Sequence, residues 1–112
     1  MAKIHTRRSA RIAQTVALFT AALLLSGAAQ ANEALAQKNN CLACHAVALK
    51  LVGPAYKDVA AKYAGQADAQ ALVMENIRNG SAGKWGDLPM PPQPKLSDAD
   101  LKKLAIWVLS AK

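Results

Sequence analysis

The most regular hydrophobic pattern of the chain lies near its C-terminus. Apolar residues recur there at intervals of three and four positions, at Leu101, Leu104, Ala105, Val108 and Leu109. This spacing places them on one face of an α-helix, which predicts a final helix that buries this face. Ser97 and Asp100 form an S-x-x-D capping box, which marks where that helix begins.

Two shorter helices are predicted in the middle of the chain. One covers about residues 55–64, in AYKDVAAKYAG, and ends at Gly65, which can adopt the left-handed backbone of a helix end. The next covers about residues 69–79, with Asp68 as its N-cap and Gly80 as its stop. The apolar stripe of this second helix consists of Leu72, Val73, Met74 and Ile77.

A further helix is predicted before these, from residue 32 or 33 to about residue 46. It is followed by LKLVGP, whose Gly53-Pro54 pair cannot continue a helix. Between the third and the last helix lies GSAGKWGDLPMPPQPKL (80–96), which has no helical pattern and contains four prolines. A long loop in so small a domain usually has a function or is disordered, and its prolines favour a stiff functional loop. Because no β-type alternation is present, we predict an all-α fold of about four helices.

The first 31 residues have the layout of a secretory signal peptide. The basic residues at the start are Lys3, Arg7, Arg8 and Arg11. They precede the apolar run IAQTVALFTAALLL (12–25) and then SGAAQA, in which Ala29 and Ala31 have the A-x-A arrangement of a cleavage site. An uncleaved membrane anchor would need about 20 apolar residues, whereas this run has 14 and includes three polar ones. We therefore predict a signal peptide over 1–31, cleaved after Ala31, and one mature domain over 32–112.

Removal of the leader changes the charge of the protein. The whole chain has a formal net charge of +7, but four of its 14 basic residues lie in the leader and all seven acidic residues lie in 32–112. The mature net charge is therefore +3, which argues against nucleic acid as a partner and suits docking on an acidic protein. A chain of 81 residues gains little more from apolar burial than it loses in entropy, so a covalent staple or a cofactor is expected.

Both cysteines and the one histidine outside the leader lie together in NNCLACHAV (39–47). In a helical segment, Cys41, Cys44 and His45 would share one face. A structural zinc site needs four ligands, and 32–112 contains no other Cys or His. A thioredoxin-like pair belongs in a βαβ unit, of which there is no sign. A disulfide across so short a loop would stabilise least and would leave His45 unexplained.

The spacing C-x-x-C-H is the pattern of covalent haem attachment. Two thiols at this spacing can reach the two vinyl groups of a porphyrin and form thioethers. The next residue, His45, can then give an imidazole nitrogen to the iron. Predicted export agrees with this, because bacteria attach c-type haem outside the cytoplasm. We predict one haem c per chain, bound covalently through Cys41 and Cys44.

The opposite side of the iron has two candidate ligands. No second histidine exists in 32–112, which leaves Met74 and Met90. Met74 lies on the apolar stripe of the third predicted helix, where a methionine ordinarily fills the core. Met90 lies among prolines that restrict the freedom of the unfolded loop, and Pro91 favours an extended backbone at Met90. We predict that Met90 is the ligand; the alternative is an ordinary apolar loop residue.

Four segments, CLACH, VGPAYKDVAAKYAG, NGSAGKWGDLPMPP and WVLSAK, closely resemble the cytochrome c-551 (cytochrome c8) family of small class I monohaem c-type cytochromes. The resemblance spans essentially all of 32–112, with the same order and spacing of motifs. It implies a small all-α class I cytochrome c fold of about four helices around one covalently attached haem. His45 and Met90 would be the axial ligands, and Cys41 and Cys44 the thioether anchors.

The resemblance also implies roles for three further residues. The carbonyl of Pro54 would accept a hydrogen bond from the ring of His45, which fixes the ring and raises its basicity. Trp85 would donate its indole N–H to a haem propionate, the alternative being a packing role in the core. Gln93 stands where family members often carry an amide near the methionine sulfur, although the spacing after it departs from some members.

An iron with both axial positions filled is suited to changing its oxidation state rather than to catalysis. The expected function is a soluble periplasmic electron carrier, not an enzyme, that is monomeric and binds neither nucleic acid nor, stably, the membrane. By resemblance, its partners would be membrane cytochrome complexes, a copper protein, and a nitrite reductase, terminal oxidase or peroxidase, in respiration or denitrification. The alternative is a haem-based sensor or enzyme in which Met90 dissociates. Candidate docking residues are Lys38, Lys50, Lys57, Lys84 and Lys95.

Overall fold

The computed structural model describes residues 32–112, so the predicted signal peptide lies outside the described residues. Residues 32–38 are helical. They are followed by a short 3-10 turn and three α-helices: η1 (Cys41–Ala43), α2 (Tyr56–Tyr63), α3 (Ala69–Asn79) and α4 (Asp98–Leu109). Residues 32–112 contain no strand, only one antiparallel bridge between Ser81 and Met90. The prediction of an all-α fold is confirmed.

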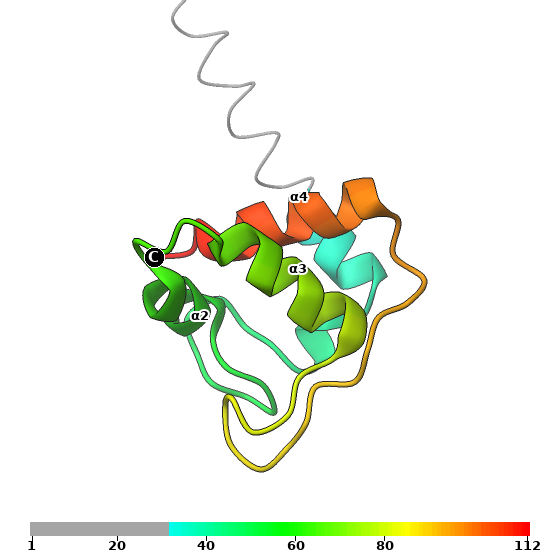
Figure 1. The fold of residues 1–112 in the computed structure, drawn as a ribbon. Coiled ribbons are helices and arrows are strands. Elements are labelled where there is room, and N and C mark those ends of the chain that lie inside the picture. The colour runs from blue at the N-terminus through cyan, green and yellow to red at the C-terminus, as the bar shows by residue number, and fades with distance from the viewer. Residues whose placement is uncertain (1–31) are drawn as a thin grey trace, which may run out of the picture. The chain divides into compact units, whose positions relative to one another are not determined.

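Helix α4 packs against both α2 and α3 (Figure 1). Four of its five predicted core residues are buried, namely Leu101, Leu104, Ala105 and Val108, while Leu109 is half-buried. One cluster of buried residues joins α4 to the other two helices and consists of Tyr56, Val59, Tyr63, Val73, Ala105 and Val108. A second, smaller cluster consists of Ala36, Leu96, Leu101 and Leu104. The helices thus enclose two small apolar clusters rather than one large core.

The helix ends follow local sequence signals. The Ser97 hydroxyl accepts a hydrogen bond from the backbone N–H of Asp100 at 3.1 Å, which caps the start of α4. Gly80, with a φ of 76°, ends α3 where predicted. Asp68 lies at the N-cap position of α3, but its side chain makes no capping hydrogen bond, so that part of the prediction was wrong.

The predicted extent of the first helix was also wrong. The helix ends after residue 38 instead of continuing to about residue 46. The side-chain amide of Asn39 donates to the Leu35 carbonyl at 2.8 Å, and Asn40 has a left-handed backbone with a φ of 59°. Asparagine tolerates this conformation better than most residues, so the Asn39-Asn40 pair stops the helix. The cysteines therefore belong to a separate turn, η1, which begins at Cys41 and has Cys44 as its C-cap.

Two long connections, 44–55 and 80–97, contain no helix, and the yellow part of the second lies beside the first in Figure 1. Both contribute residues to one pocket, together with the inner faces of α2, α3 and α4. Among the helices in 32–112, none combines the length and the apolar character that crossing a membrane requires.

Candidate functional site

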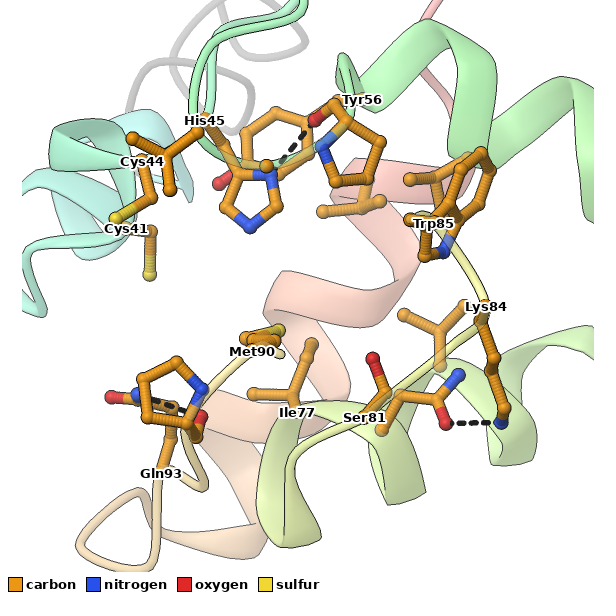
Figure 2. A pocket seen from close by; sticks show the side chains of 18 of the residues that line it. Cys41, Cys44, His45, Tyr56, Ile77, Ser81, Lys84, Trp85, Met90 and Gln93 are labelled. Atoms are coloured by element: carbon orange, nitrogen blue, oxygen red, sulfur yellow. Dashed lines mark hydrogen bonds between the residues drawn. The ribbon is translucent and has the colours of Figure 1, made fainter. Parts of the chain in front are cut away.

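The pocket brings together residues that are far apart in the sequence. Figure 2 shows Cys41, Cys44 and His45 on one side and Met90 on the facing side. The space between the walls is about 1240 Å³, including the part that opens to solvent. The pocket thus separates the cysteines and His45 from Met90 by an open space that segments far apart in the sequence line.

The turn η1 and the residues after it present the two thiols. The backbone N–H groups of Cys44 and His45 both donate to the carbonyl of Cys41, at 3.2 and 3.0 Å. Burial raises the pKa of the Cys41 thiol, and a backbone hydrogen bond only partly opposes this shift. Cysteines that react as thiolates have lowered pKa values instead. The surroundings of Cys41 therefore do not favour thiol–disulfide chemistry.

The ring of His45 is held by one hydrogen bond and one stacking contact. Its Nδ1 lies 2.8 Å from the carbonyl oxygen of Pro54. Because a carbonyl can only accept, Nδ1 carries the proton and Nε2 keeps a free lone pair. The ring stacks on Tyr56, with centroids 5.1 Å apart and planes at 18°. Figure 2 shows the His45 ring pointing into the pocket from this support.

Tyr56 forms the back support of His45, and sequence reasoning gave it no role. Its ring packs edge-on against Trp107 with centroids 5.2 Å apart. Burial, with smaller contributions from the two nearby cysteines, raises the pKa of the Tyr56 phenol. The phenol therefore stays neutral. In the sequence, the only signal for the role of Tyr56 was its position as an aromatic residue directly after Gly53-Pro54-Ala55.

Gly53 lies close against the His45 ring. A Cβ atom built at Gly53 would lie 2.4 Å from Cε1 of His45 and 2.8 Å from Nδ1. Contacts this short do not occur, so any other residue at this position must displace the ring. The backbone N–H of Gly53 also donates to the Cys44 carbonyl at 2.8 Å, which ties the 44–55 connection back to the cysteine turn.

We therefore expect Gly53→Ala to lower the free energy of unfolding of the haem-loaded protein by about 1–3 kcal/mol, the usual cost of overpacking. Guanidinium unfolding followed by haem absorbance measures this change. The matched control is Gly65→Asn, because nothing lies within 4 Å of a Cβ at Gly65 and Asn tolerates its φ of 77°. Equal stability of the two variants would contradict the packing role of Gly53.

Met90 is fixed through its backbone. Its N–H donates to the Ser81 carbonyl at 2.8 Å, and its carbonyl accepts from the Ser81 N–H at 3.1 Å. A Cβ atom at Gly80 would lie 2.6 Å from the Met90 carbonyl oxygen, so glycine is needed for this close approach. Further along, the N–H of Gln93 donates to the Ile77 carbonyl at 3.0 Å. The methionine is thus held against the end of α3.

Arg78 anchors the far end of the same loop. Its guanidinium donates to the Leu96 carbonyl at 2.9 Å and forms an ion pair with Asp98 at 2.6 Å. The loop is therefore fastened to α3 at both ends. The predicted stiffness thus comes from these tertiary hydrogen bonds in addition to the prolines.

The two methionines differ in surroundings as the sequence predicted. Met74 is half-buried between the two apolar clusters and does not line the pocket. Its sulfur lies 3.9 Å from the Gln70 side-chain amide. Met90 lines the pocket and faces His45 (Figure 2).

Trp85 and Gln93 also line the pocket. Trp85 is half-buried, packs against the larger apolar cluster and has the Lys62 ammonium 4.4 Å from its ring centroid. Gln93 donates its side-chain amide to the Pro91 carbonyl at 3.2 Å. In this structure the Gln93 amide is therefore engaged away from the Met90 sulfur.

Sequence reasoning missed a surface feature of the two long connections, 44–55 and 80–97. Large apolar side chains are exposed on them, and we call these the apolar rim: Val47, Leu49, Leu51, Val52 and Leu88. Two of them, Val52 and Leu88, also line the pocket. Exposed apolar side chains commonly mark interaction sites where they form a patch. Part of the signal was present in LKLVGP (49–54), which was interpreted only as a helix break.

A family model for cytochrome c matches residues 29–112, which includes the whole part of the chain that forms this site. The chain belongs to the cytochrome c family. This cytochrome is 56% identical to cytochrome c-552 of Nitrosomonas europaea over 91 residues, covering 81% of this chain and 88% of that protein. It is 54% identical to cytochrome c-551 of Pseudomonas aeruginosa over 96 residues, covering 85% of this chain and 91% of that protein.

A solved structure agrees with this assignment. The crystal structure of the wild-type Nitrosomonas europaea cytochrome c552 superposes on this cytochrome with a TM-score of 0.69 at 55% identity, covering 71% of this chain and 99% of that chain. The class I cytochrome c fold expected from the sequence is confirmed. Its relatives are named as cytochromes, and this cytochrome is likewise a small c-type electron carrier rather than an enzyme.

One haem c, bound covalently at the C-x-x-C-H arrangement of Cys41 and Cys44, is the cofactor of this cytochrome. The structure fits that group. The two cysteines lie in the wall of a pocket with a mostly apolar lining. A nitrogen with a free lone pair and a thioether face each other across it. Imidazole and thioether are known axial ligands of haem iron in c-type cytochromes.

Proposed function

We propose that this cytochrome is a periplasmic one-electron carrier in which His45 and Met90 bind the iron from opposite sides. The observation that carries the proposal is the facing pair of donors, each held by hydrogen bonds: Nδ1 of His45 to the Pro54 carbonyl and the Met90 backbone to Ser81. Bound haem supplies a one-electron couple between Fe(III) and Fe(II). With His45 and Met90 as its ligands, the iron would have no free position for a substrate.

The protein groups around the iron favour its reduced state. The hydrogen bond from His45 to Pro54 fixes the ring and makes it a stronger donor, which by itself favours Fe(III). A neutral thioether and an apolar pocket act in the opposite direction, because they disfavour the additional positive charge of Fe(III). A positive reduction potential is therefore expected. Because hydrogen bonds of the fold hold both donors, they would change position little between the two oxidation states.

The proposed cellular location, the periplasm, is inferred from the sequence of residues 1–31. We propose that residues 1–31 are a signal peptide and that 32–112 is the mature periplasmic domain. Expression in a bacterium that matures c-type cytochromes, followed by N-terminal sequencing of the periplasmic fraction, is expected to give Asn32 as the first residue. A protein that retains Met1 and stays with the membrane fraction would contradict this proposal.

Electron exchange requires a surface on which a redox partner can dock. The proposed surface is the apolar rim, two of whose residues line the pocket, together with the exposed Lys50 and Lys57. Its occupant would be a redox protein that presents an apolar patch with an acidic border. Apolar contact would stabilise the complex, while opposite charges would speed association and keep it transient.

We expect Leu49→Ser to slow second-order electron transfer to such a partner by about fivefold, because burial of one leucine side chain contributes about 1 kcal/mol. Stopped-flow mixing at several partner concentrations measures the rate. The matched control is Ile106→Ser. It also removes an exposed apolar side chain, 47% exposed compared with 67% for Leu49, but Ile106 does not line the pocket. Equal rates for both variants would contradict docking on the apolar rim.

We propose a nitrite reductase, a terminal oxidase or a peroxidase as the acceptor, the enzymes that the resemblance to the cytochrome c-551 family implies. Reduction assays with each of these enzymes from the same periplasm, started with the reduced cytochrome, distinguish among them. The physiological acceptor is expected to show a rate that falls as the salt concentration rises, because charge-guided docking is screened by salt. Rates that are slow and independent of salt with all three would contradict an acceptor of this class.

A further inference from the structure

Lys84 is the only Lys, Arg, Asp or Glu among the residues that line the pocket in the described part of the chain. Figure 2 shows it across the pocket from the two cysteines, at the end where Trp85 lies. Its ammonium is held by the side-chain oxygen of Asn76 at 2.7 Å. The amide of Asn76 in turn donates to the Tyr63 hydroxyl at 3.2 Å. A charged group on the rim of a largely apolar pocket is thus held in place by a polar chain from α2 and α3.

A second cation lies at the same end. The ammonium of Lys62 sits 4.4 Å from the ring centroid of Trp85 and donates to the Lys84 carbonyl at 3.1 Å. The ion pairs found in 32–112 are Arg78–Asp98 and Lys103–Asp100. Neither lysine therefore has a carboxylate partner among the described residues. Two ammonium groups and the indole of Trp85 therefore lie together at this end of the pocket, and neither ammonium forms an ion pair with a carboxylate of residues 32–112.

This arrangement suits a carboxylate that comes with the cofactor. A haem carries two carboxylates, its propionates, on the edge of the ring away from the vinyl groups that the cysteines bind. If Cys41 and Cys44 hold the vinyl side, as the proposed function requires, the acidic edge faces the opposite end of the pocket. Ammonium and carboxylate groups within a few ångströms stabilise each other's charged forms.

We propose that Lys84, positioned by Asn76, is the counter-ion of a haem carboxylate and thereby makes the reduction potential more positive. The inference rests on the proposed function, since it needs the haem to be attached at the cysteines. A positive charge near the iron destabilises Fe(III) relative to Fe(II) and offsets the negative charge of the carboxylate. Lys84 therefore acts on the cofactor, in contrast to the docking role that the sequence alone suggested.

The test compares reduction potentials of haem-loaded variants at fixed pH and low salt. Lys84→Gln is expected to lower the potential, and Lys84→Arg, which keeps the charge, to restore it. Lys102→Gln on α4 removes the same charge from an exposed position that does not line the pocket, and is expected to change the potential much less. Asn76→Asp, which places a competing carboxylate 2.7 Å from the ammonium, is expected to lower the potential as Lys84→Gln does.

Equal shifts for Lys84→Gln and Lys102→Gln would overturn the proposal, because loss of net charge would then explain both. A slower reaction of Lys84→Gln with a redox partner at an unchanged potential would also overturn it, in favour of a docking role. The absorption spectrum of each variant separates these outcomes from failure of the proposed function. A protein without covalent haem contradicts the proposed function, whereas normal covalent haem with an unmoved potential contradicts only the role of Lys84.

Discussion

Replacing Met90 with alanine is expected to abolish the far-red absorption band of the oxidised protein. It is also expected to lower the reduction potential by roughly 0.1–0.3 V, since the choice of axial ligand changes haem potentials over a range of about 0.8 V. Met90 is the thioether that faces His45 across the pocket (Figure 2). Its removal leaves the iron open to water, a ligand that favours Fe(III) more than a thioether does. Visible spectroscopy during a redox titration measures both changes.

Met74→Ala is the matched control for this experiment. Met74 packs between the apolar clusters and does not line the pocket, so the far-red band and the potential are expected to stay near wild-type values. The free energy of unfolding is expected to fall by about 2 kcal/mol, at the low end for a methionine because the side chain is half-buried. If Met74→Ala lost the band and Met90→Ala kept it, the assignment of the sixth ligand would be wrong.

The double variant Cys41→Ser and Cys44→Ser is expected to release its haem into acidified organic solvent, whereas the wild-type haem stays with the protein. Without the two thioethers, the free energy of unfolding is expected to fall by several kcal/mol, comparable to the roughly 2–5 kcal/mol that a small domain loses with a native cross-link. The effect is large because 32–112 form only two small apolar clusters around the pocket. Solvent extraction and thermal unfolding measure the two changes.

The single variants Cys41→Ser and Cys44→Ser serve as internal controls. Each is expected to keep one thioether, so its haem should resist extraction and its stability should lie between those of the wild type and the double variant. Haem that stays with the double variant after extraction would show that the cysteines do not attach it.

Local signals were sufficient to predict most of the helices. Ser97 caps the start of α4 and Gly80, with its positive φ, ends α3. Both signals lie next to the helix that they delimit, so α3 and α4 were placed correctly. The end of the first helix was missed because Leu42 and Ala43 are compatible with a helix. The Asn39-Asn40 pair is a weaker local signal than a glycine, and the structure shows that it ends the helix.

Haem attachment could be predicted from the sequence because its residues are contiguous, at Cys41 and Cys44 in the C-x-x-C-H arrangement. The supports of the site come from distant segments that meet only in the fold. Nothing in the sequence near Ser81 indicates that its backbone pairs with Met90. Likewise, the contact between Gly53 and the His45 ring depends on how the chain turns back after the cysteines, which the pattern of residues does not specify.

The closed state of the iron is tested most directly by adding carbon monoxide to the reduced wild-type protein at neutral pH and recording its visible spectrum. With His45 and Met90 both bound, the spectrum is expected to remain unchanged, while the same treatment of Met90→Ala produces a new carbon monoxide-bound spectrum. Rapid and complete conversion of the wild-type protein would contradict the account, because it would mean that the iron is open to ligands and suited to sensing or catalysis.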